Sequence, residues 1–341
     1  MNEKETILVT GGCGYIGSNC AIELLDQNYD VVIIDDLRNS KIKTLERISE
    51  ITGVTNLKFY DFDINDFSKV LHVFENENIK GVIHFAAEKS VQMSINHPLD
   101  FYENNLGGTI NIIKAMSIIG VKNFIFSSSA TVYDKESLSP LSEDSSPLNP
   151  SNPYGKSKLF VEQILKDVCN SDEDFSCGIL RYFNPIGAHN SGKIGEEPKN
   201  NGGNLGPALV KAMKSENKNF QIFGNDYETR DGTCIRDFIH ITDLSKGHVS
   251  ALKYFEANKG LCIWNLGTGR GYTVLEVIEA FEKISGLKFE IEFCPRRDGD
   301  IAISYSSPTK AENDLNWKAD LSLNDMLSDL CKWSYELDGK K

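Results

Sequence analysis

Long hydrophobic runs, paired cysteines and an excess of positive charge are all missing from this sequence of 341 residues. No apolar stretch approaches the roughly 18 residues that cross a bilayer, so we expect no membrane partner. The eight cysteines form no C-x-x-C pair, and a chain of this length needs no disulfide framework, so reduced thiols are expected. The start, M-N-E-K-E-T-I-L-V-T, carries acids where a signal peptide carries bases, which predicts a cytoplasmic location.

Positive charge is scarce: 36 basic residues face 49 acidic ones, which gives a formal net charge of −13. Such a chain repels phosphate polyanions, so we expect no nucleic acid as main partner. The six histidines show no H-x-x-x-H or similar ligand spacing, so no metal site is expected. Hydrophobic residues at 40% and charged residues at 25% are typical of a folded globular protein, and the length suggests about two domains.

The first half of the chain alternates short β-rich apolar runs with longer amphipathic segments. The runs predict strands at 7–9, 31–34, 57–60, 82–85, 124–126 and 179–183. The segments between them predict helices at 16–27, 41–50, 66–77, 98–119 and 153–169. This alternation predicts an α/β fold with a Rossmann-like, doubly wound parallel sheet.

A polar stretch rich in Gly, Asn and Pro begins at residue 184 and predicts a domain boundary. We expect one domain over 1–183 and a smaller mixed α/β domain over 184–341, allowing for some of its strands returning to the first sheet. Its expected strands are 221–223, 238–241, 263–266 and 289–293, and its expected helices are 207–214, 244–255, 274–284 and 323–333.

Three glycines follow the first predicted strand, because T-G-G-C-G-Y-I-G places Gly11, Gly14 and Gly17 ahead of a helical pattern. Such glycines form a tight turn and let the backbone approach a pyrophosphate at a helix N-terminus. Asp35 closes the second predicted strand, where a carboxylate accepts both ribose hydroxyls of NAD and repels the 2′-phosphate of NADP. The pattern predicts NAD as cofactor; the alternative is a merely structural glycine turn.

Two other glycine-rich stretches carry weaker signals. The segment 187–193 spells most of a phosphate loop, but Ile194 stands where a magnesium-binding Ser or Thr is needed. The segment 267–271 lacks a following acidic residue at the required distance, which favours a close-packing turn. Cys13, inside the first glycine loop, is interpreted as a small buried thiol rather than a redox group.

Tyr154 and Lys158 are spaced by four residues near the start of a predicted helix, so they share one face. An adjacent ammonium and a helix N-terminus favour a phenolate, which predicts a lowered tyrosine pKa and an acid–base role. Ser129 follows a predicted strand, at the sheet edge where ligands bind, and is expected to hold the reacting oxygen. The alternative is an exposed tyrosine that happens to have a lysine as neighbour.

Motifs along nearly the whole chain resemble a known family. T-G-x-x-G-x-x-G and Y-x-x-x-K are similar to the extended short-chain dehydrogenase/reductase superfamily. More narrowly, seven longer motifs resemble the UDP-galactose (UDP-glucose) 4-epimerase family. They are G-Y-I-G-S, F-I-F-S-S-S-A-T-V-Y, N-P-Y-G-K-S-K, R-Y-F-N-P, I-F-G-N-D-Y, D-G-T-C-I-R-D-F-I-H and R-R-D-G-D.

The resemblance implies three sets of site residues. The catalytic set comprises Ser129, Tyr154 and Lys158. Besides the glycines and the pair Tyr154 and Lys158, the NAD contacts are Tyr15, Ile16, Asp35, Asp36, Leu37, Arg38, Asn39, Ser40, Asp63, Ile64, Phe85, Ala86, Ala87, Lys89, Asn104 and Phe183. Besides Ser129, the UDP-sugar contacts are Asn184, Asn204, Leu205, Gln221, Ile222, Phe223, Arg236, Arg297, Asp300 and Ser304.

The family's reaction would be a transient oxidation at C4 of a UDP-hexose, followed by return of the hydride to the opposite face. Guanidinium groups bind a diphosphate bidentately, which suits Arg236 and Arg297; a surface salt bridge is the alternative for either one. Ser304 stands where many members have a bulky Tyr, which implies room for a 2-acetamido group and predicts the N-acetylhexosamine pair as further substrates. The sequence departs from the family at Glu88, Asp134 and the segment 201–203, which leaves nicotinamide-side details open.

Three other functions remain as alternatives. A UDP-glucuronate or UDP-pentose 4-epimerase would differ only in pocket shape around C5. A nucleotide-sugar 4,6-dehydratase needs an Asp-Glu dyad where this chain has Ala130 and Thr131. A non-catalytic NAD-binding protein would not need the Ser, Tyr and Lys kept here.

Apolar residues recur at spacings of three and four along the helix predicted from residue 98. Members of the family pair such helices across a homodimer, which we expect here. The alternative is that this stripe only covers its own sheet. Its members are Leu99, Tyr102, Leu106, Ile110 and Ile113.

Overall fold

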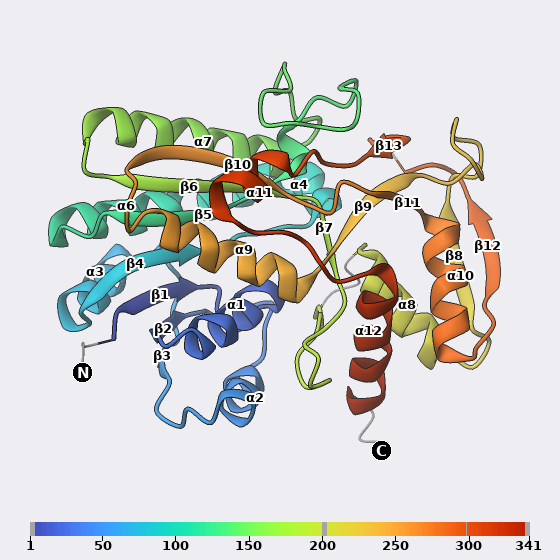
Figure 1. Ribbon diagram of the computed structural model, residues 1–341, viewed down its shortest axis with the longest axis horizontal. Coiled ribbons are helices and arrows are strands. Elements are labelled where there is room, and N and C mark those ends of the chain that lie inside the picture. Colours follow the sequence, from blue (N-terminus) through green and yellow to red (C-terminus); the bar gives the residue numbers. More distant parts are fainter. Residues whose placement is uncertain (1–3, 200–202, 298, 338–341) are drawn as a thin grey trace.

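A parallel sheet forms the centre of the computed structural model, which describes residues 4–199, 203–297 and 299–337 (Figure 1). Within these residues it has seven strands in the spatial order β10-β6-β5-β4-β1-β2-β3. This order contains the 3-2-1-4-5-6 arrangement of a dinucleotide-binding sheet, so the switch point lies between β1 and β4. The strands are β1 (Thr6–Thr10), β2 (Asp30–Ile34), β3 (Lys58–Tyr60), β4 (Ile79–His84), β5 (Asn123–Ser129), β6 (Ser176–Tyr182) and β10 (Gly260–Leu266).

Helices cover both faces of this sheet, because successive residues of each strand point to opposite sides. Ile7 and Val9 of β1 pack in one buried cluster, and Leu8 between them packs in another. The first cluster takes residues from α1 (Tyr15–Asp26), α2 (Lys43–Thr52), α9 (Ile241–Tyr254) and α11 (Thr309–Leu315). The second takes residues from α3 (Phe67–Asn76), α6 (Gly108–Ile119) and α7 (Pro153–Ser171). The Rossmann-like α/β class predicted from the sequence is confirmed.

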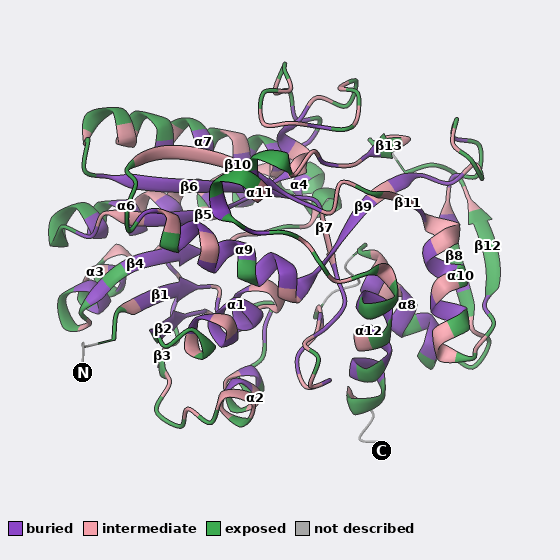
Figure 2. Ribbon diagram, in the orientation of Figure 1, coloured by how far each residue is buried: buried purple, intermediate pink, exposed green. Residues whose placement is uncertain are grey.

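The second half of the chain builds smaller sheets beside the first (Figure 1). β9 (Ile235–His240) pairs with β7 (Asn184–Ile186), β11 (Gly271–Thr273) and β13 (Ile303–Ser304), and β8 (Asn219–Phe223) pairs with β12 (Glu290–Cys294). A third buried cluster joins α8 (Leu205–Lys214), α10 (Val274–Ser285) and α12 (Leu323–Leu337). Purple segments in Figure 2 mark the buried strands of the central sheet and the inner faces of these helices.

Residues 241–266 leave the second half and rejoin the central sheet. β10 pairs in parallel with β6 from Gly260 opposite Ser176 to Leu266 opposite Tyr182, and α9 lies against α1. The expected strand at 263–266 is thus the end of a longer one. The predicted domain boundary at residue 184 remains a prediction. Residues 241–266 follow that boundary in the sequence but pack with the first sheet.

The segment 98–119, predicted as one helix, is interrupted by a π-helical turn. α5 (Pro98–Tyr102) is followed by that turn (Glu103–Gly107) and then by α6, with α4 (Val91–Asn96) ahead of them. π-turns occur often at functional sites, where they redirect side chains. Here the turn brings Asn104 and Asn105 to the edge where β3 and β4 end. The sequence did not predict several short elements, namely α4, α11, β7, β11, β13 and the 3₁₀ turn Ala130–Val132.

Candidate functional site

The glycine loop between β1 and α1 is built so that nothing larger than hydrogen fits at two positions. Gly11 has φ +68°, and a Cβ on it would lie 2.8 Å from the Ala86 amide nitrogen. A Cβ on Gly17 would lie 2.3 Å from the Gly11 carbonyl oxygen. Gly14 is the N-cap of α1, so the free N–H groups of this helix begin at the loop. This cradle fits a pyrophosphate that must approach the backbone closely.

Asp35 lies buried at the end of β2 and accepts three hydrogen bonds from the chain itself. Its donors are the Cys13 amide at 2.9 Å, the Leu37 amide at 2.9 Å and the Ser40 hydroxyl at 2.7 Å. Burial raises the pKa of this carboxyl, and the three bonds oppose that rise. A carboxylate has about four acceptor positions, so roughly one is left for a ribose hydroxyl.

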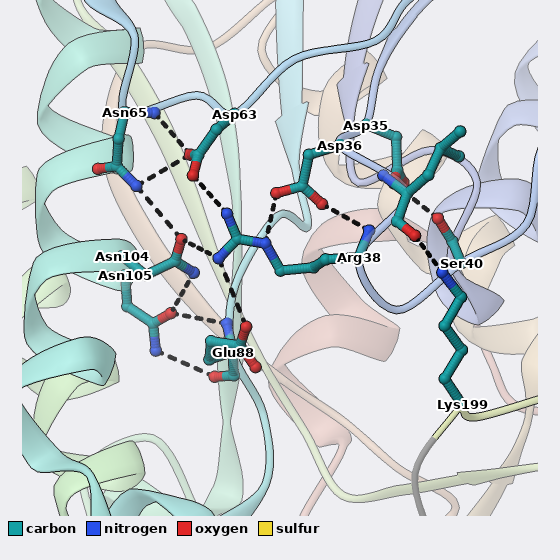
Figure 3. Close-up of polar contacts among 11 residues, drawn as sticks. Asp35, Asp36, Arg38, Ser40, Asp63, Asn65, Glu88, Asn104, Asn105 and Lys199 are labelled. Atoms are coloured by element: carbon teal, nitrogen blue, oxygen red, sulfur yellow. Dashed lines mark hydrogen bonds and ion pairs between the residues drawn. The ribbon is translucent and has the colours of Figure 1, made fainter.

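Arg38 gathers polar groups from the ends of β2, β3 and β4 (Figure 3). Its Nε lies 2.5 Å from Asp36, and its terminal nitrogens contact Asp63, the Asn104 amide oxygen at 3.2 Å and Glu88 at 3.6 Å. Burial opposes the charge, but the facing Asp36 and Asp63 raise the pKa of Arg38. Three carboxylates around one guanidinium leave excess negative charge, which disfavours a 2′-phosphate here.

The remaining cofactor-side residues line the same edge of the sheet. Tyr15 donates to the Gly187 carbonyl at 2.8 Å, and the Ala86 amide donates to Thr10 Oγ1 at 3.3 Å. The Phe85 ring lies 4.8 Å from that of His248. Ile16 packs against the first cluster, Ile64 and Phe183 are buried, Asn39 is exposed and Ala87 is half-buried.

The acid–base residues meet where β5 ends and α7 begins. Ser129 is the last residue of β5, and Tyr154 and Lys158 lie in the first turns of α7. Asn152 caps that helix by accepting from the Gly155 amide at 2.9 Å. The Tyr154 side chain lies close enough to Ser129 for the Ser129 hydroxyl to affect its pKa.

Lys158 is buried and donates from Nζ to the Ser127 carbonyl at 2.8 Å, 5.9 Å from the centre of the Tyr154 ring. Burial lowers the pKa of Lys158 to about 7, and Glu162 opposes that shift. The ammonium therefore coexists with its neutral amine at neutral pH.

The predicted direction of the Tyr154 pKa is wrong. Burial raises the pKa of this phenol, and the interaction with Ser129 lowers it only in part. The sequence showed a cation one helical turn away. It did not show that the same low-dielectric surroundings destabilise that cation as well as the phenolate.

Some of the residues expected to bind the UDP-sugar form a cluster around Arg236 and Arg297. Others contact different parts of the chain. Asp300 lies 3.0 Å from Arg297 Nε and 4.0 Å from an Arg236 terminal nitrogen. Ser304 pairs with Arg236 in β-register, and the Arg297 guanidinium lies 5.1 Å from the centre of the Phe223 ring. Arg236 and Arg297, which are more than 60 positions apart in the sequence, thus both approach the carboxylate of Asp300.

Four other residues of this set have different partners. Asn184 donates to the Asp237 carbonyl at 2.9 Å, and Gln221 donates to Glu292 at 2.9 Å. Ile222 is buried in the third cluster, and Leu205 packs against it. Asp298 and residues 201–202, parts of two stretches singled out in the sequence, lie outside the described residues.

Sequence reasoning missed Glu196 and Asn105. Glu196 accepts from Lys89 Nζ at 2.6 Å and from the Asn204 amide at 2.8 Å, so it connects a cofactor-side residue with a sugar-side one. Asn105 holds the Glu88 backbone from both sides, accepting from its amide at 2.8 Å and donating to its carbonyl at 3.0 Å. Glu196 lies in a loop with no periodic pattern, so no sequence signal marked it.

The weaker sequence signals have structural explanations. Lys193 of the phosphate-loop-like stretch pairs with Glu50 at 2.7 Å. A Cβ on Gly267 would lie 2.5 Å from Asp237 Oδ2, as expected for a close-packing turn. Asp134 accepts from the Glu136 amide at 2.7 Å and the Asn149 side chain at 2.9 Å, so it orders an exposed turn. Burial raises the pKa of the Cys13 thiol, which makes it less reactive.

Comparison with known proteins gives consistent matches. The sequence matches the family model for the NAD dependent epimerase/dehydratase family over residues 7–267. The UDP-glucose 4-epimerase of Bacillus subtilis (strain 168) is 47% identical over 336 residues, which are 98% of this chain and 98% of that protein.

Two solved structures have nearly the same fold. The UDP-glucose 4-epimerase from Bifidobacterium longum in complex with NAD+ and UDP has a TM-score of 0.94 at 45% identity, covering 98% of this chain and 100% of its own. The enzyme from Stenotrophomonas maltophila with bound NAD and formylated UDP-arabinopyranose has a TM-score of 0.95 at 42% identity, covering 98% and 99%.

Proposed function

We propose, on the premise that this chain belongs to the NAD dependent epimerase/dehydratase family, that it inverts C4 of UDP-glucose and UDP-galactose with NAD as its cofactor. The observation that carries the proposal is that two groups lie at the carboxyl edge of the central sheet, where β1 and β5 end, and that a third lies at the neighbouring sheet of β9 and β13. The first two are the glycine cradle and Ser129 with Tyr154 and Lys158, and the third is the arginine pair at Asp300.

The chain's residues fit NAD at the switch point. The cradle of Gly11 and Gly17 would hold the pyrophosphate, and Asp35 would accept a ribose hydroxyl. Asn39, Ile64, Phe85, Asn104 and the other cofactor-side residues named above would line the remaining path. When bound, NAD supplies a hydride acceptor and donor at C4.

Tyr154, as the phenolate, would accept the proton of the sugar's 4-hydroxyl when C4 gives up its hydride, and would return that proton when the hydride comes back. Ser129 would hydrogen bond to the same sugar oxygen. Ser129 lies close enough to the Tyr154 hydroxyl to affect its pKa, so the two side chains can contact one sugar oxygen. Lys158 in its charged form stabilises the phenolate that forms on proton release. Arg236 and Arg297 would bind the diphosphate, which anchors the nucleotide and leaves the hexose free to present either face.

The test is to incubate the purified protein with UDP-glucose or UDP-galactose, without added NAD, and to identify the products. Interconversion of the two sugars is expected, together with NAD released on acid denaturation. A 4,6-dehydrated product, or no reaction in the presence of added NAD, would contradict the proposal.

Substrate range is proposed to include the 2-acetamido sugars UDP-N-acetylglucosamine and UDP-N-acetylgalactosamine. Ser304 pairs with Arg236 in β-register, so its small side chain lies beside the proposed diphosphate site. Ser304→Tyr should abolish turnover of the acetylated pair and retain turnover of UDP-galactose, with Ser68→Tyr at an exposed position on α3 as control. Equal loss of both activities in Ser304→Tyr, or no turnover of acetylated sugars by the unaltered chain, would contradict this.

The cytoplasmic location stays a prediction, which cell fractionation would test. Over residues 4–199, 203–297 and 299–337, none of the helices is both long and apolar enough to cross a membrane. The homodimer is likewise proposed; support comes from apolar side chains exposed on α5 and α7, where Leu99 is 77% and Phe160 45% exposed.

A further inference from the structure

A buried ion pair lies directly behind the proton-transfer residues. Glu162 of α7 and Arg181 of β6 have side chains only 4% and 2% exposed. Arg181 donates from Nε to Glu162 Oε1 at 3.0 Å and from a terminal nitrogen to Oε2 at 2.6 Å. Removing two charges from water is costly, and the cost is offset only when every polar atom of the pair finds a partner.

The pair connects α7 with the end of β5. Ser128 donates to Glu162 Oε1 at 2.5 Å, and one turn earlier Lys158 donates to the Ser127 carbonyl at 2.8 Å. Two side chains one turn apart on the helix therefore hold two successive residues of the strand. The next residue of that strand is Ser129.

The far side of Arg181 is also held. A terminal nitrogen donates to the Tyr133 hydroxyl at 3.2 Å and to the Glu143 carbonyl at 3.3 Å. The Tyr133 hydroxyl in turn donates to the Asn265 side chain of β10 at 2.7 Å. The guanidinium is thus held by Glu162 of α7 and by two residues of the segment between β5 and α7, Tyr133 and Glu143.

We propose that Glu162, held by Arg181, is a positioning residue that fixes the ammonium of Lys158 and the Ser129 end of β5 relative to Tyr154. The proposal rests on the proposed C4 epimerisation. Its structural basis is independent of any ligand, since the network of Ser128, Glu162 and Arg181 is complete within the chain.

Charge adds a second effect of Glu162 on Lys158. The titratable groups near the ammonium are Tyr154 and Glu162 of α7, His84 of β4 and, through Ser127, Tyr182 of β6. Burial lowers the pKa of Lys158, and the charge of Glu162 raises it. Without that carboxylate, Lys158 should lose its proton at a lower pH.

The direct test is Glu162→Gln, which keeps the shape and removes the charge. The pH midpoint of Lys158 is measured without substrate by NMR of protein carrying ¹³Cε-lysine, with the signal assigned by its loss in Lys158→Met. The midpoint should fall by on the order of one pH unit. The dependence of kcat on pH should shift in the same direction, with KM for UDP-galactose changed less than about twofold. An unchanged midpoint and an unchanged kcat profile would overturn the proposal.

Asp172→Asn is the matched control. It breaks an ion pair with Lys122 at 2.6 Å at the other end of the same helix, so it should alter neither the midpoint nor kcat. Failure of the unaltered chain to epimerise would refute the proposed function, while the substrate-free midpoint would still test the role of Glu162.

Loss of one partner from a buried ion pair can prevent folding. A second variant is therefore needed to measure the contribution of the pair to kcat in a folded protein. Glu162→Leu combined with Arg181→Met replaces the pair by apolar side chains of similar volume, a change that proteins often tolerate. The folded double variant should lose on the order of 10-fold to 100-fold in kcat. Wild-type kcat there would show that the pair only stabilises the fold. If neither variant folds, Ser128→Ala decides, with a kcat loss at unchanged KM supporting the proposal and unchanged kcat overturning it.

Discussion

At the scale of single residues, burial acts on both members of the proposed acid–base pair. It raises the pKa of Tyr154 and lowers that of Lys158 to about 7, so both neutral forms are favoured. Burial thus favours a phenol that keeps its own proton, whereas accepting a proton from the sugar requires the phenolate. A charged Lys158 is what would let the phenol release its own proton, which makes the environment of the lysine as important as the tyrosine itself.

Tyr154→Phe should reduce kcat on the order of 10²-fold to 10⁴-fold, because it removes the hydroxyl that transfers the proton and leaves the ring in place. Steady-state kinetics with UDP-galactose would measure the loss, and bound NAD should not change. Tyr335→Phe, at an exposed position on α12, should keep full activity as the control. Near-wild-type kcat in Tyr154→Phe would remove the proposed role.

His84 predicts how stability depends on pH. It is buried between the hydroxyls of Thr10 at 2.7 Å and Thr109 at 2.9 Å, and burial lowers its pKa from 6.5 to about 3. The unfolded chain then binds a proton between these values and the folded chain does not. The stability from neutral His84 is fully present above pH 6.5 and is lost as the pH falls toward 3.

Urea unfolding at pH 4 and pH 7 would measure this effect. His84→Gln should lose stability at pH 7 and show a smaller difference between the two pH values than the unaltered chain. His72→Gln, on the exposed face of α3, is the control and should keep the original difference. An equal pH difference in His84→Gln and the unaltered chain would contradict the assignment.

At the scale of elements, α7 is the structure that converts a sequence spacing into an active-site geometry. Pro153 starts the helix, Asn152 caps it, and a Cβ on Gly155 would lie 2.7 Å from the Thr131 carbonyl. The start of α7 is therefore pressed against the 3₁₀ turn that follows Ser129. The position of Tyr154 depends on this contact.

Asn152→Ala should cost about 1 kcal/mol of stability, because the Gly155 amide loses its cap. It should also lower kcat, since the first turn of α7 carries Tyr154. Ser322→Ala removes a comparable capping bond, from the Asp325 amide on α12, and should lower stability without changing kcat. Chemical denaturation and steady-state kinetics on both variants would separate the two effects; equal kcat values would count against the proposed coupling.

At the scale of the whole molecule, the helices α4, α5, α6 and α7 present apolar side chains on their outer surface. Of the apolar stripe predicted there, Ile113 is buried against the molecule's own sheet, whereas Leu99 is exposed. Tyr102 lies against the exposed Phe160 with ring centres 5.9 Å apart. The apolar stripe therefore has two parts. The part with Ile113 is buried within the chain, and the part with Leu99 is exposed and can contact a second copy.

Light scattering at micromolar concentration should give twice the chain mass of 38.1 kDa. Leu99→Arg should shift the protein toward single chains, because a buried charge in such an interface is costly. Leu138→Arg replaces a leucine that is 88% exposed on the loop between β5 and α7, outside the predicted apolar stripe, and should remain dimeric. A single-chain mass for the unaltered protein would contradict the proposed homodimer.

The sequence by itself determined the fold class and the elements of the first sheet. Hydrophobic periodicity, glycine spacing and proline positions are local signals, so they marked β1, α1 and the start of α7. The spacing of Tyr154 and Lys158 determined that they share a helix face, and the resemblance supplied most of the residues proposed for the site.

Only the tertiary structure decided how those residues act. The lowered pKa of Lys158 and the raised pKa of Tyr154 depend on what surrounds them, not on their spacing. Glu196, Asn105 and the pair of Glu162 and Arg181 acquire their partners from distant segments, so no local pattern could show them. A low-dielectric environment and long-range contacts arise only when the chain is folded. They could therefore not be predicted from the sequence.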